Sequence, residues 1–152
     1  MARRILHHRP HAPAPSPRAR RGATILEMAL ALGILLSLSF GTVEFGYFFF
    51  VKNTVQGAAR EGARVAITPT ASNSDVTTAV NNALQAAGMR PADFTTTVKV
   101  AGVVANCNTA VAGQSVEVSV QATWGTVGLR PLGIIATSKA VLGGATMRKE
   151  GN

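Results

Sequence analysis

An apolar segment of 29 residues, Ala23–Val51, constrains the fold of this chain more than any other feature. The segment contains only two charged residues, Glu27 and Glu44. As a helix rising about 1.5 Å per residue, it is long enough to cross a bilayer core of about 30 Å. It also exceeds the apolar part of an ordinary secretory signal, which is about 7–15 residues long. The sequence therefore predicts a retained transmembrane helix over residues 23–51.

The positive charge of the chain precedes this segment. Residues 1–22 contain six arginines and no acid, whereas residues 23–152 contain nine Lys and Arg against seven Asp and Glu. The positive-inside rule then predicts a cytoplasmic N-terminus and a C-terminal part outside the membrane. The alternating prolines of HAPAPSP oppose a stable helix, so residues 1–22 are predicted to be a disordered basic leader.

The same charge distribution argues against nucleic-acid binding. The net charge of +8 belongs mainly to the leader, and five of the eight aromatic residues lie in Phe45–Phe50 at the end of the apolar segment. A nucleic-acid-binding protein usually has a basic face on its folded part, with aromatic residues available for stacking. We therefore expect no nucleic-acid partner.

Residues that carry catalysis are scarce outside the leader. All three histidines precede Pro13, the acids are scattered singly, and no phosphate-binding loop is present. The single cysteine, Cys107, cannot form an intrachain disulfide, and no Cys/His spacing is typical of a metal site. We expect no enzyme activity, no cofactor and no metal, and we interpret Cys107 as a thiol in a loop.

Beyond the apolar segment, helical periodicity continues until Pro69. Small or apolar residues recur at three- and four-residue steps, namely Val51, Val55, Ala58, Ala59, Gly62 and Ala66. The sequence thus predicts that the helix extends outside the membrane over residues 52–68.

Residues 69–152 are predicted to form a small α+β head domain. A short amphipathic helix is expected after a cap at Asn73 or Ser74, with Asp75 in its first turn and Gly88 at its end. Alternating or β-branched residues then predict three strands, over Thr95–Val104, Val116–Trp124 and Ser138–Arg148. The short helix should pack on this antiparallel sheet, which together with the long helix gives an α+β fold.

Small residues also form rows along the long helix. Gly33, Ser37 and Gly41 follow one another at four-residue steps, and Ala58 and Gly62 repeat the pattern outside the membrane. Apolar helices are rich in small residues in any case, but such rows also allow helices to approach closely. We favour helix–helix packing as their role.

The beginning of the apolar segment, RRGATILEMALALG, places a carboxylate five residues after a glycine. Glu27 would reach the lipid headgroups if it were only an acid near the inner surface. However, a basic pair, a glycine, an apolar helix and this glutamate together resemble the N-terminus of type IV prepilins. That resemblance implies cleavage after Gly22, with Ala23 as the mature N-terminus. The new ammonium group would then be the partner of Glu27 and would lower the cost of its burial.

The following stretch, VEFGYFFFVKNTVQGAAREGARVAI, resembles the TadE-like pseudopilins of the tight-adherence (Flp-type) pilus apparatus, as do the RRGATILEMAL start and the TMRKE finish. The resemblance implies a minor subunit in the bacterial inner membrane. Its implied partners are a prepilin peptidase, other pilin or pseudopilin subunits, the inner-membrane assembly platform and membrane lipid.

Two charged features keep alternative interpretations. Glu44 is either a carboxylate near the outer interface or a charge paired with another subunit or the assembly platform. Arg60, Glu61 and Arg64 are interpreted as a solvated face with one i,i+3 pair. For the whole protein, the alternative function is an unprocessed single-pass anchor with an exported binding domain.

Overall fold

The computed structural model of the chain describes residues 17–151, so the predicted disorder of residues 1–16 lies outside the described residues. The chain divides into two compact units between Leu38 and Ser39. The first unit contributes the beginning of a long helix. The second, called the head below, contains the rest of that helix and everything after it.

The long helix, α1, spans Pro17–Ala66 and therefore begins inside the predicted leader. The prediction of disorder up to residue 22 is thus wrong for Pro17–Gly22. Proline is well suited to the first turn of a helix, because its ring fixes φ and its missing N–H would have no partner there. Arginine and alanine, which follow in PRARRGA, are good helix formers, so one glycine does not stop the helix.

In the first unit, α1 exposes an almost continuous apolar surface. From Gly22 onward the helix is long and apolar enough to cross a membrane. Its large apolar side chains are between 54% and 70% exposed at Ile25, Leu30 and Leu32. Such a surface requires an apolar environment, either lipid or other apolar helices. This part of α1 suits a membrane anchor, as the sequence predicted.

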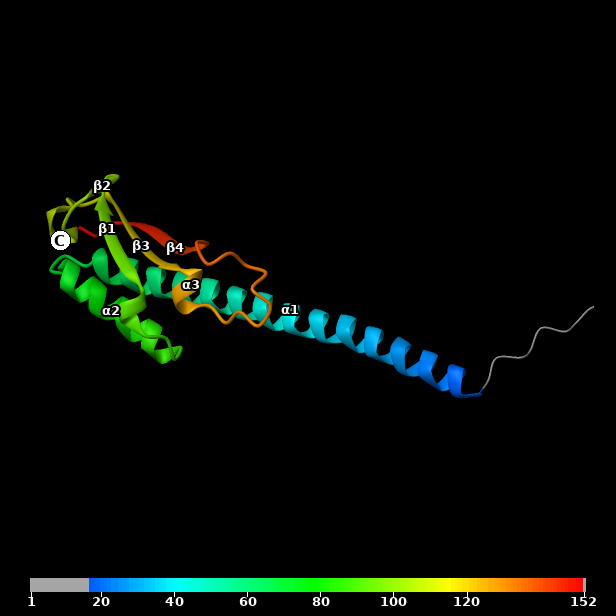
Figure 1. Cartoon of the computed structure of the whole chain (residues 1–152). Coiled ribbons are helices and arrows are strands. Elements are labelled where there is room, and N and C mark those ends of the chain that lie inside the picture. The colour runs from blue at the N-terminus through cyan, green and yellow to red at the C-terminus, as the bar shows by residue number, and fades with distance from the viewer. Residues whose placement is uncertain (1–16, 152) are drawn as a thin grey trace, which may run out of the picture. The chain divides into compact units, whose positions relative to one another are not determined.

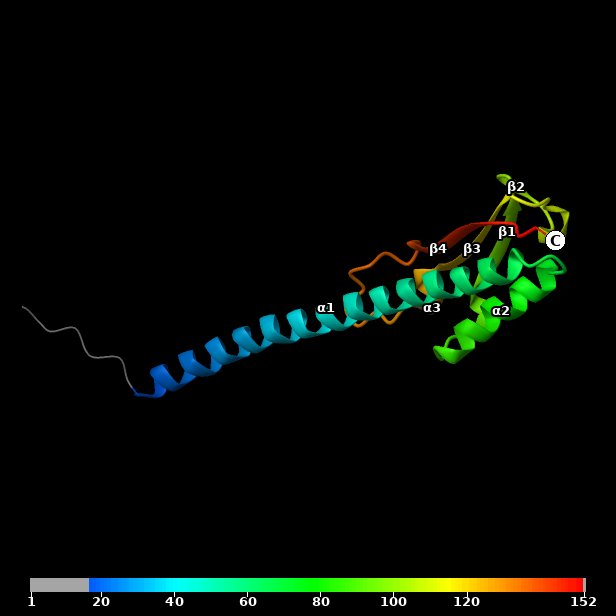
Figure 2. The same ribbon diagram turned by 180° about the vertical axis from the view of Figure 1, so that it is seen from behind.

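The head is built around the C-terminal part of α1 (Figures 1 and 2). Four antiparallel strands form a sheet in the order β2-β1-β3-β4. Their bounds are Thr95–Val100 for β1, Val103–Val104 for β2, Ser115–Thr123 for β3 and Ala140–Arg148 for β4. One face of β3 is fully buried through Val116, Val118 and Val120, while the residues between them are more accessible. Helices α1 and α2 (Asn73–Ala86) supply the other half of this core, which confirms the predicted α+β fold.

The strand boundaries differ from the prediction in two places. Residues 95–104 form two strands, because Ala101 and Gly102 both have positive φ (50° and 86°) and make the tight turn between β1 and β2. Trp124 does not end β3 but begins the short helix α3, Trp124–Val127. Its side chain is nevertheless fully buried and packs edge-on against Phe48 at a centroid distance of 5.2 Å.

Helix α2 is capped at both ends by local hydrogen bonds. The N-cap is Ser72, not the predicted Asn73 or Ser74, because its hydroxyl and Asp75 form a reciprocal capping box. At the other end, Met89 N–H donates to Leu84 O and Gly88 N–H donates to Gln85 O. Gly88 has the positive φ of 76° that this Schellman arrangement requires, so the predicted stop at Gly88 is confirmed.

The edge strand β4 lies directly against the backbone of α1. A Cβ atom at Gly143 would fall 2.6 Å from the carbonyl carbon and oxygen of Val55, so only glycine fits there. The Gln56 side chain donates to Gly144 O at 2.7 Å and accepts from Gly144 N–H at 3.3 Å. These bonds satisfy the N–H and C=O groups of Gly144 on the outer edge of β4. Unpaired backbone groups are a common liability of edge strands.

The C-terminal residues hold the end of α1. Lys149 is buried, and its ammonium group donates to Ala66 O at 3.2 Å and to Thr68 O at 2.6 Å. Glu150 N–H also donates to Ile67 O at 3.1 Å. A cation at the last carbonyls of a helix satisfies free acceptors and complements the helix dipole.

Cys107 lies in the 3₁₀ turn Cys107–Thr109 and is fully buried, with its thiol 3.3 Å from Ala71 O. Burial raises the pKa of this thiol above its ordinary value. Because the thiolate is the reactive form, we expect alkylation of Cys107 in the folded protein to be at least about a hundredfold slower than in denaturant. Mass spectrometry after timed exposure to iodoacetamide at pH 8 measures both rates. Equal rates would contradict the buried position.

Candidate functional site: the anchor helix and a buried glutamate

The predicted processing site lies in α1. Gly22 and Ala23 are both helical and exposed, and Glu27 is exposed one turn later. Residues four apart in a helix lie on the same face. The backbone of Ala23 and the side chain of Glu27 are thus on one side of α1, which is the geometry that pairing with a new N-terminal amine requires.

The row of small residues in the first unit lies on an open surface. Gly33 and Ser37 line a shallow groove along the helix together with their apolar neighbours. The Ser37 hydroxyl donates to Gly33 O at 2.8 Å, so it is satisfied within the helix. Gly41, which belongs to the head, has Ile134 as its neighbour, with a Cβ position 3.6 Å from the terminal methyl group.

The second row of small residues packs inside the head. Ala58 and Gly62 are buried in the core. A Cβ atom at Gly62 would lie 2.7 Å from Val80 on α2 and 3.1 Å from Val118 on β3. These positions thus bring α1 close to elements of its own chain, and they are not open to another subunit.

Glu44 is fully buried, although it lies on α1 between the exposed residues Val43 and Phe45. Its two carboxylate oxygens accept hydrogen bonds from backbone N–H groups, from Ile135 at 2.8 Å and from Leu132 at 3.2 Å. The partners of Glu44 are thus two amides of one loop of its own chain. The buried carboxylate is not accessible for the predicted pairing with another subunit or the assembly platform, whereas a position near the outer interface stays a prediction.

The loop that holds Glu44 runs over residues 128–137, between α3 and β4. Gly133 has a positive φ of 66°, a conformation that favours glycine, and it lies between the two donors. The turn at Gly133 directs the amides of Leu132 and Ile135 toward the same carboxylate. The sequence marks this loop through Pro131 and Gly133, but nothing in it identifies Glu44 as the partner.

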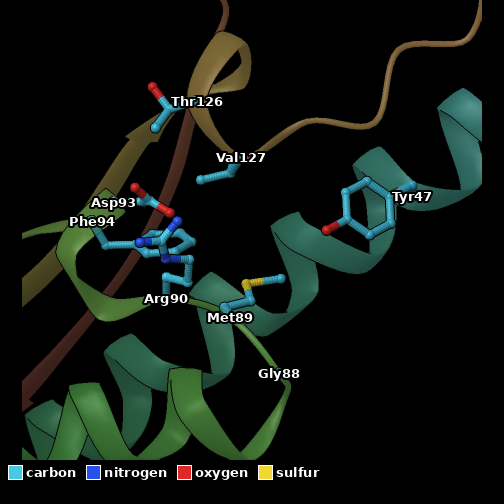
Figure 3. A pocket seen from close by; sticks show the side chains of 8 residues that line it. All are labelled: Tyr47, Gly88, Met89, Arg90, Asp93, Phe94, Thr126 and Val127. Atoms are coloured by element: carbon cyan, nitrogen blue, oxygen red, sulfur yellow. The ribbon is translucent and has the colours of Figure 1, made fainter.

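A small cavity in the head lies beside Tyr47 (Figure 3). Its volume is about 240 Å³, and Arg90 and Asp93 supply the charged part of its lining. Ligand pockets usually enclose about 300–1,000 Å³, so this cavity is small for an organic ligand. Among residues 17–151, no three His, Cys, Asp or Glu side chains come together as a metal site.

The charged residues of AAREGAR form the predicted exposed pair. Arg64 and Glu61 make a salt bridge of 2.9 Å, with side chains 71% and 52% exposed. Such i,i+3 pairs contribute about 0.2–0.5 kcal/mol. The interpretation as a solvated face agrees with this exposure.

One continuous segment of α1 contains the anchor, the predicted processing site, Glu44 and most of the buried stripe from Val51 to Ala66. Residues 22–64 match the family model of the TadE-like proteins. The predicted resemblance is therefore confirmed over this TadE-like segment, which begins at Gly22. Neither the comparison with curated proteins nor that with solved structures found a match. The match covers 43 of the 152 residues and is confined to α1.

Proposed function

We propose that this protein is a minor pilin or pseudopilin of a Tad/Flp-type pilus or a related secretion system. The observation that carries the proposal is the start of the TadE-like segment at Gly22, the residue after which cleavage is expected. A prepilin peptidase would remove residues 1–22 and leave Ala23 as the N-terminus. The protein's work is then assembly, not catalytic turnover.

The proposed location is the bacterial inner membrane, with the N-terminus in the cytoplasm and the head outside. The exposed apolar surface of α1 between Ala23 and Leu38 supports a membrane anchor. The arginines before Gly22 support the orientation. Other pilin subunits and the assembly platform are the expected protein partners, and membrane lipid surrounds the anchor.

Glu27 has the central role in the proposed assembly step. After cleavage, its carboxylate and the ammonium group of Ala23 lie on one face of α1, within a subunit or between neighbours. Their pairing lowers the cost of placing either charge in an apolar environment. The position of Glu27 thus guides the register of the subunit among its neighbours.

The Glu27→Gln variant tests this role in cells that carry the complete pilus system. Loss of the charge should leave the membrane level of the protein unchanged but lower its recovery in assembled complexes by at least about tenfold. Crosslinking followed by affinity purification of the assembly platform measures this recovery. Glu61→Gln, a change at an exposed acid on the same helix, is the matched control and should assemble normally. Unchanged assembly of Glu27→Gln would contradict the proposed pairing.

The alternative function is an unprocessed anchor with an exported binding domain. The cavity beside Tyr47 is the feature that favours it, but its volume of about 240 Å³ leaves little room for a ligand. The two functions differ in the N-terminal residue of the protein in the membrane. A chain that keeps Met1 or Ala2 in the presence of the peptidase would favour the alternative.

A further inference from the structure

The loop over residues 128–137 displays large apolar side chains that the head does not cover. Leu129, Leu132 and Ile134 are 51%, 42% and 53% exposed. The only charged residue of the loop is Arg130, which is also exposed. Three large apolar residues so close together on the surface of one loop indicate a contact with an apolar environment.

The loop that carries these apolar side chains is held in place by contacts with α1. Glu44 accepts from the backbone of Leu132 and Ile135, and Ile134 lies against Gly41 on α1. The two hydrogen bonds hold the loop on the first turns of α1 within the head. The apolar side chains therefore lie next to the part of the helix where the chain enters the head.

Connectivity places that entry at the end of the membrane anchor. A bilayer core of about 30 Å takes about 20 helical residues, so a span that begins at Ala23 ends near residue 43. The head begins at Ser39. Within its first residues, Phe40 and Val43 are 44% and 48% exposed. These two residues and the loop residues Leu129, Leu132 and Ile134 form what we call the apolar rim.

We propose that the apolar rim is seated in the outer leaflet of the membrane that the anchor crosses, with Arg130 at the level of the lipid phosphates. Lipid fits the rim because Phe40 and Val43 follow directly on the exposed apolar residues of α1, and the loop is held on the same turns of the helix through Glu44 and Gly41. Leucine, isoleucine and phenylalanine beside an arginine are also the usual composition of interfacial segments, in which the basic group reaches back to the headgroups.

A position of the loop in the leaflet explains why Glu44 is buried beneath it. Irregular backbone at membrane depth is tolerated only where its polar groups are satisfied within the protein, because lipid tails offer no hydrogen-bond partners. Glu44 supplies an acceptor for two N–H groups of the loop. The loop can thus lie in the leaflet without exposing these donors.

The inference rests on the membrane anchoring proposed above, and the test separates the two. The full chain is reconstituted in vesicles of phosphatidylethanolamine and phosphatidylglycerol. A polarity-sensitive fluorophore (NBD) is attached to a single introduced cysteine. Leu129→Cys reports on the rim, Leu32→Cys reports on the anchor, and Val103→Cys is the exposed apolar control. Val103 pairs with Val100 and lies in β2, the strand at the end of the sheet away from α3 (Figures 1 and 2), and Cys107 stays buried and unlabelled.

Quenching is then measured with two lipids, one with a nitroxide group near its carbonyl for Leu129 and Val103, and one with the nitroxide near the end of its acyl chain for Leu32, because Leu32 lies near the middle of the span. We expect the fluorophore at Leu129 to be quenched at least about twofold more than at Val103, as for a group within the leaflet. Quenching at Leu32 without quenching at Leu129 would overturn the inference and keep the anchor. A blue-shifted but unquenched signal at Leu129 would place protein there instead of lipid and would also overturn it. Absence of quenching at both positions would contradict the anchor as well as the rim.

Discussion

Replacing Gly143 by alanine should destabilise the head by about 3 kcal/mol, since an added methyl group has no space between β4 and α1. The new Cβ would meet the backbone of Val55 and Gln56 at 2.6 Å. Backbone atoms in the middle of a helix cannot move aside as the end of a side chain can. Strand β4 would have to separate from α1, and the Gln56 hydrogen bonds to Gly144 would be lost with it.

The matched control for this prediction is the adjacent glycine. At Gly144 the nearest atom to an added Cβ is 3.9 Å away, so Gly144→Ala should change the stability by no more than about 0.5 kcal/mol. Urea unfolding of the full chain in detergent micelles, followed by the emission of Trp124, measures both variants. Trp124 is the single tryptophan and is fully buried in the head. Equal effects of the two substitutions would show that β4 does not lie against the backbone of α1.

Substitution of Glu44 by alanine should release the loop over residues 128–137. The variant leaves the N–H groups of Leu132 and Ile135 without their acceptor. Because hydrogen bonds to a charged group are among the stronger ones, we expect these two amides to exchange with deuterium on the order of ten- to a hundredfold faster. The amides of β3 should keep their protection, since the core of the head does not depend on this carboxylate.

Two further variants give this prediction its control. Glu44→Gln keeps the size of the side chain and one acceptor oxygen, so its effect should fall between those of glutamate and alanine. Glu61→Ala removes an acid whose salt bridge is exposed. In this variant, deuterium exchange of the loop amides should be the same as in the unsubstituted protein. Hydrogen–deuterium exchange of the full chain in lipid nanodiscs is the measurement. Unchanged exchange at residues 132 and 135 in Glu44→Ala would contradict the hydrogen bonds.

The features that the sequence predicted well are those whose signal is local. The stripe from Val51 to Ala66 and the alternation of β3 each reflect a periodicity within one element, and the apolar segment after Gly22 is a continuous run within one helix. Burial agrees with the two periodic patterns because a helix or strand of the head must turn its apolar side to the core. The predicted beginning of α1 was too late, because proline opposes a helix in its interior but suits its first turn, and Pro17 occupies that turn.

The features that the sequence did not predict depend on residues far apart in the chain. Glu44 meets donors 88 and 91 positions later, and Lys149 meets carbonyls more than 80 positions earlier. No periodicity reports on such pairs. From the sequence alone, Gly143 and Gly144 would be expected only to weaken the last strand, because glycine has no side chain to pack. In the structure the backbones of β4 and α1 lie too close together at Gly143 for any Cβ atom, and only the packed fold reveals that.

The same distinction applies to the rows of small residues. Spacing alone gave Gly33, Ser37, Gly41, Ala58 and Gly62 one common role in helix packing. The fold separates them, because Gly62 packs against α2 and β3 whereas Gly33 lies on an open surface. A spacing of four residues identifies one face of a helix, but it does not identify what covers that face.

The N-terminal residue of the protein in the membrane tests the central claim most directly. Intact-mass measurement and N-terminal sequencing compare cells that contain the prepilin peptidase with cells that lack it. We predict a chain that begins at Ala23 when the peptidase is present and an uncleaved chain when it is absent. A chain that still begins at Met1 or Ala2 in cells with an active peptidase would contradict the account.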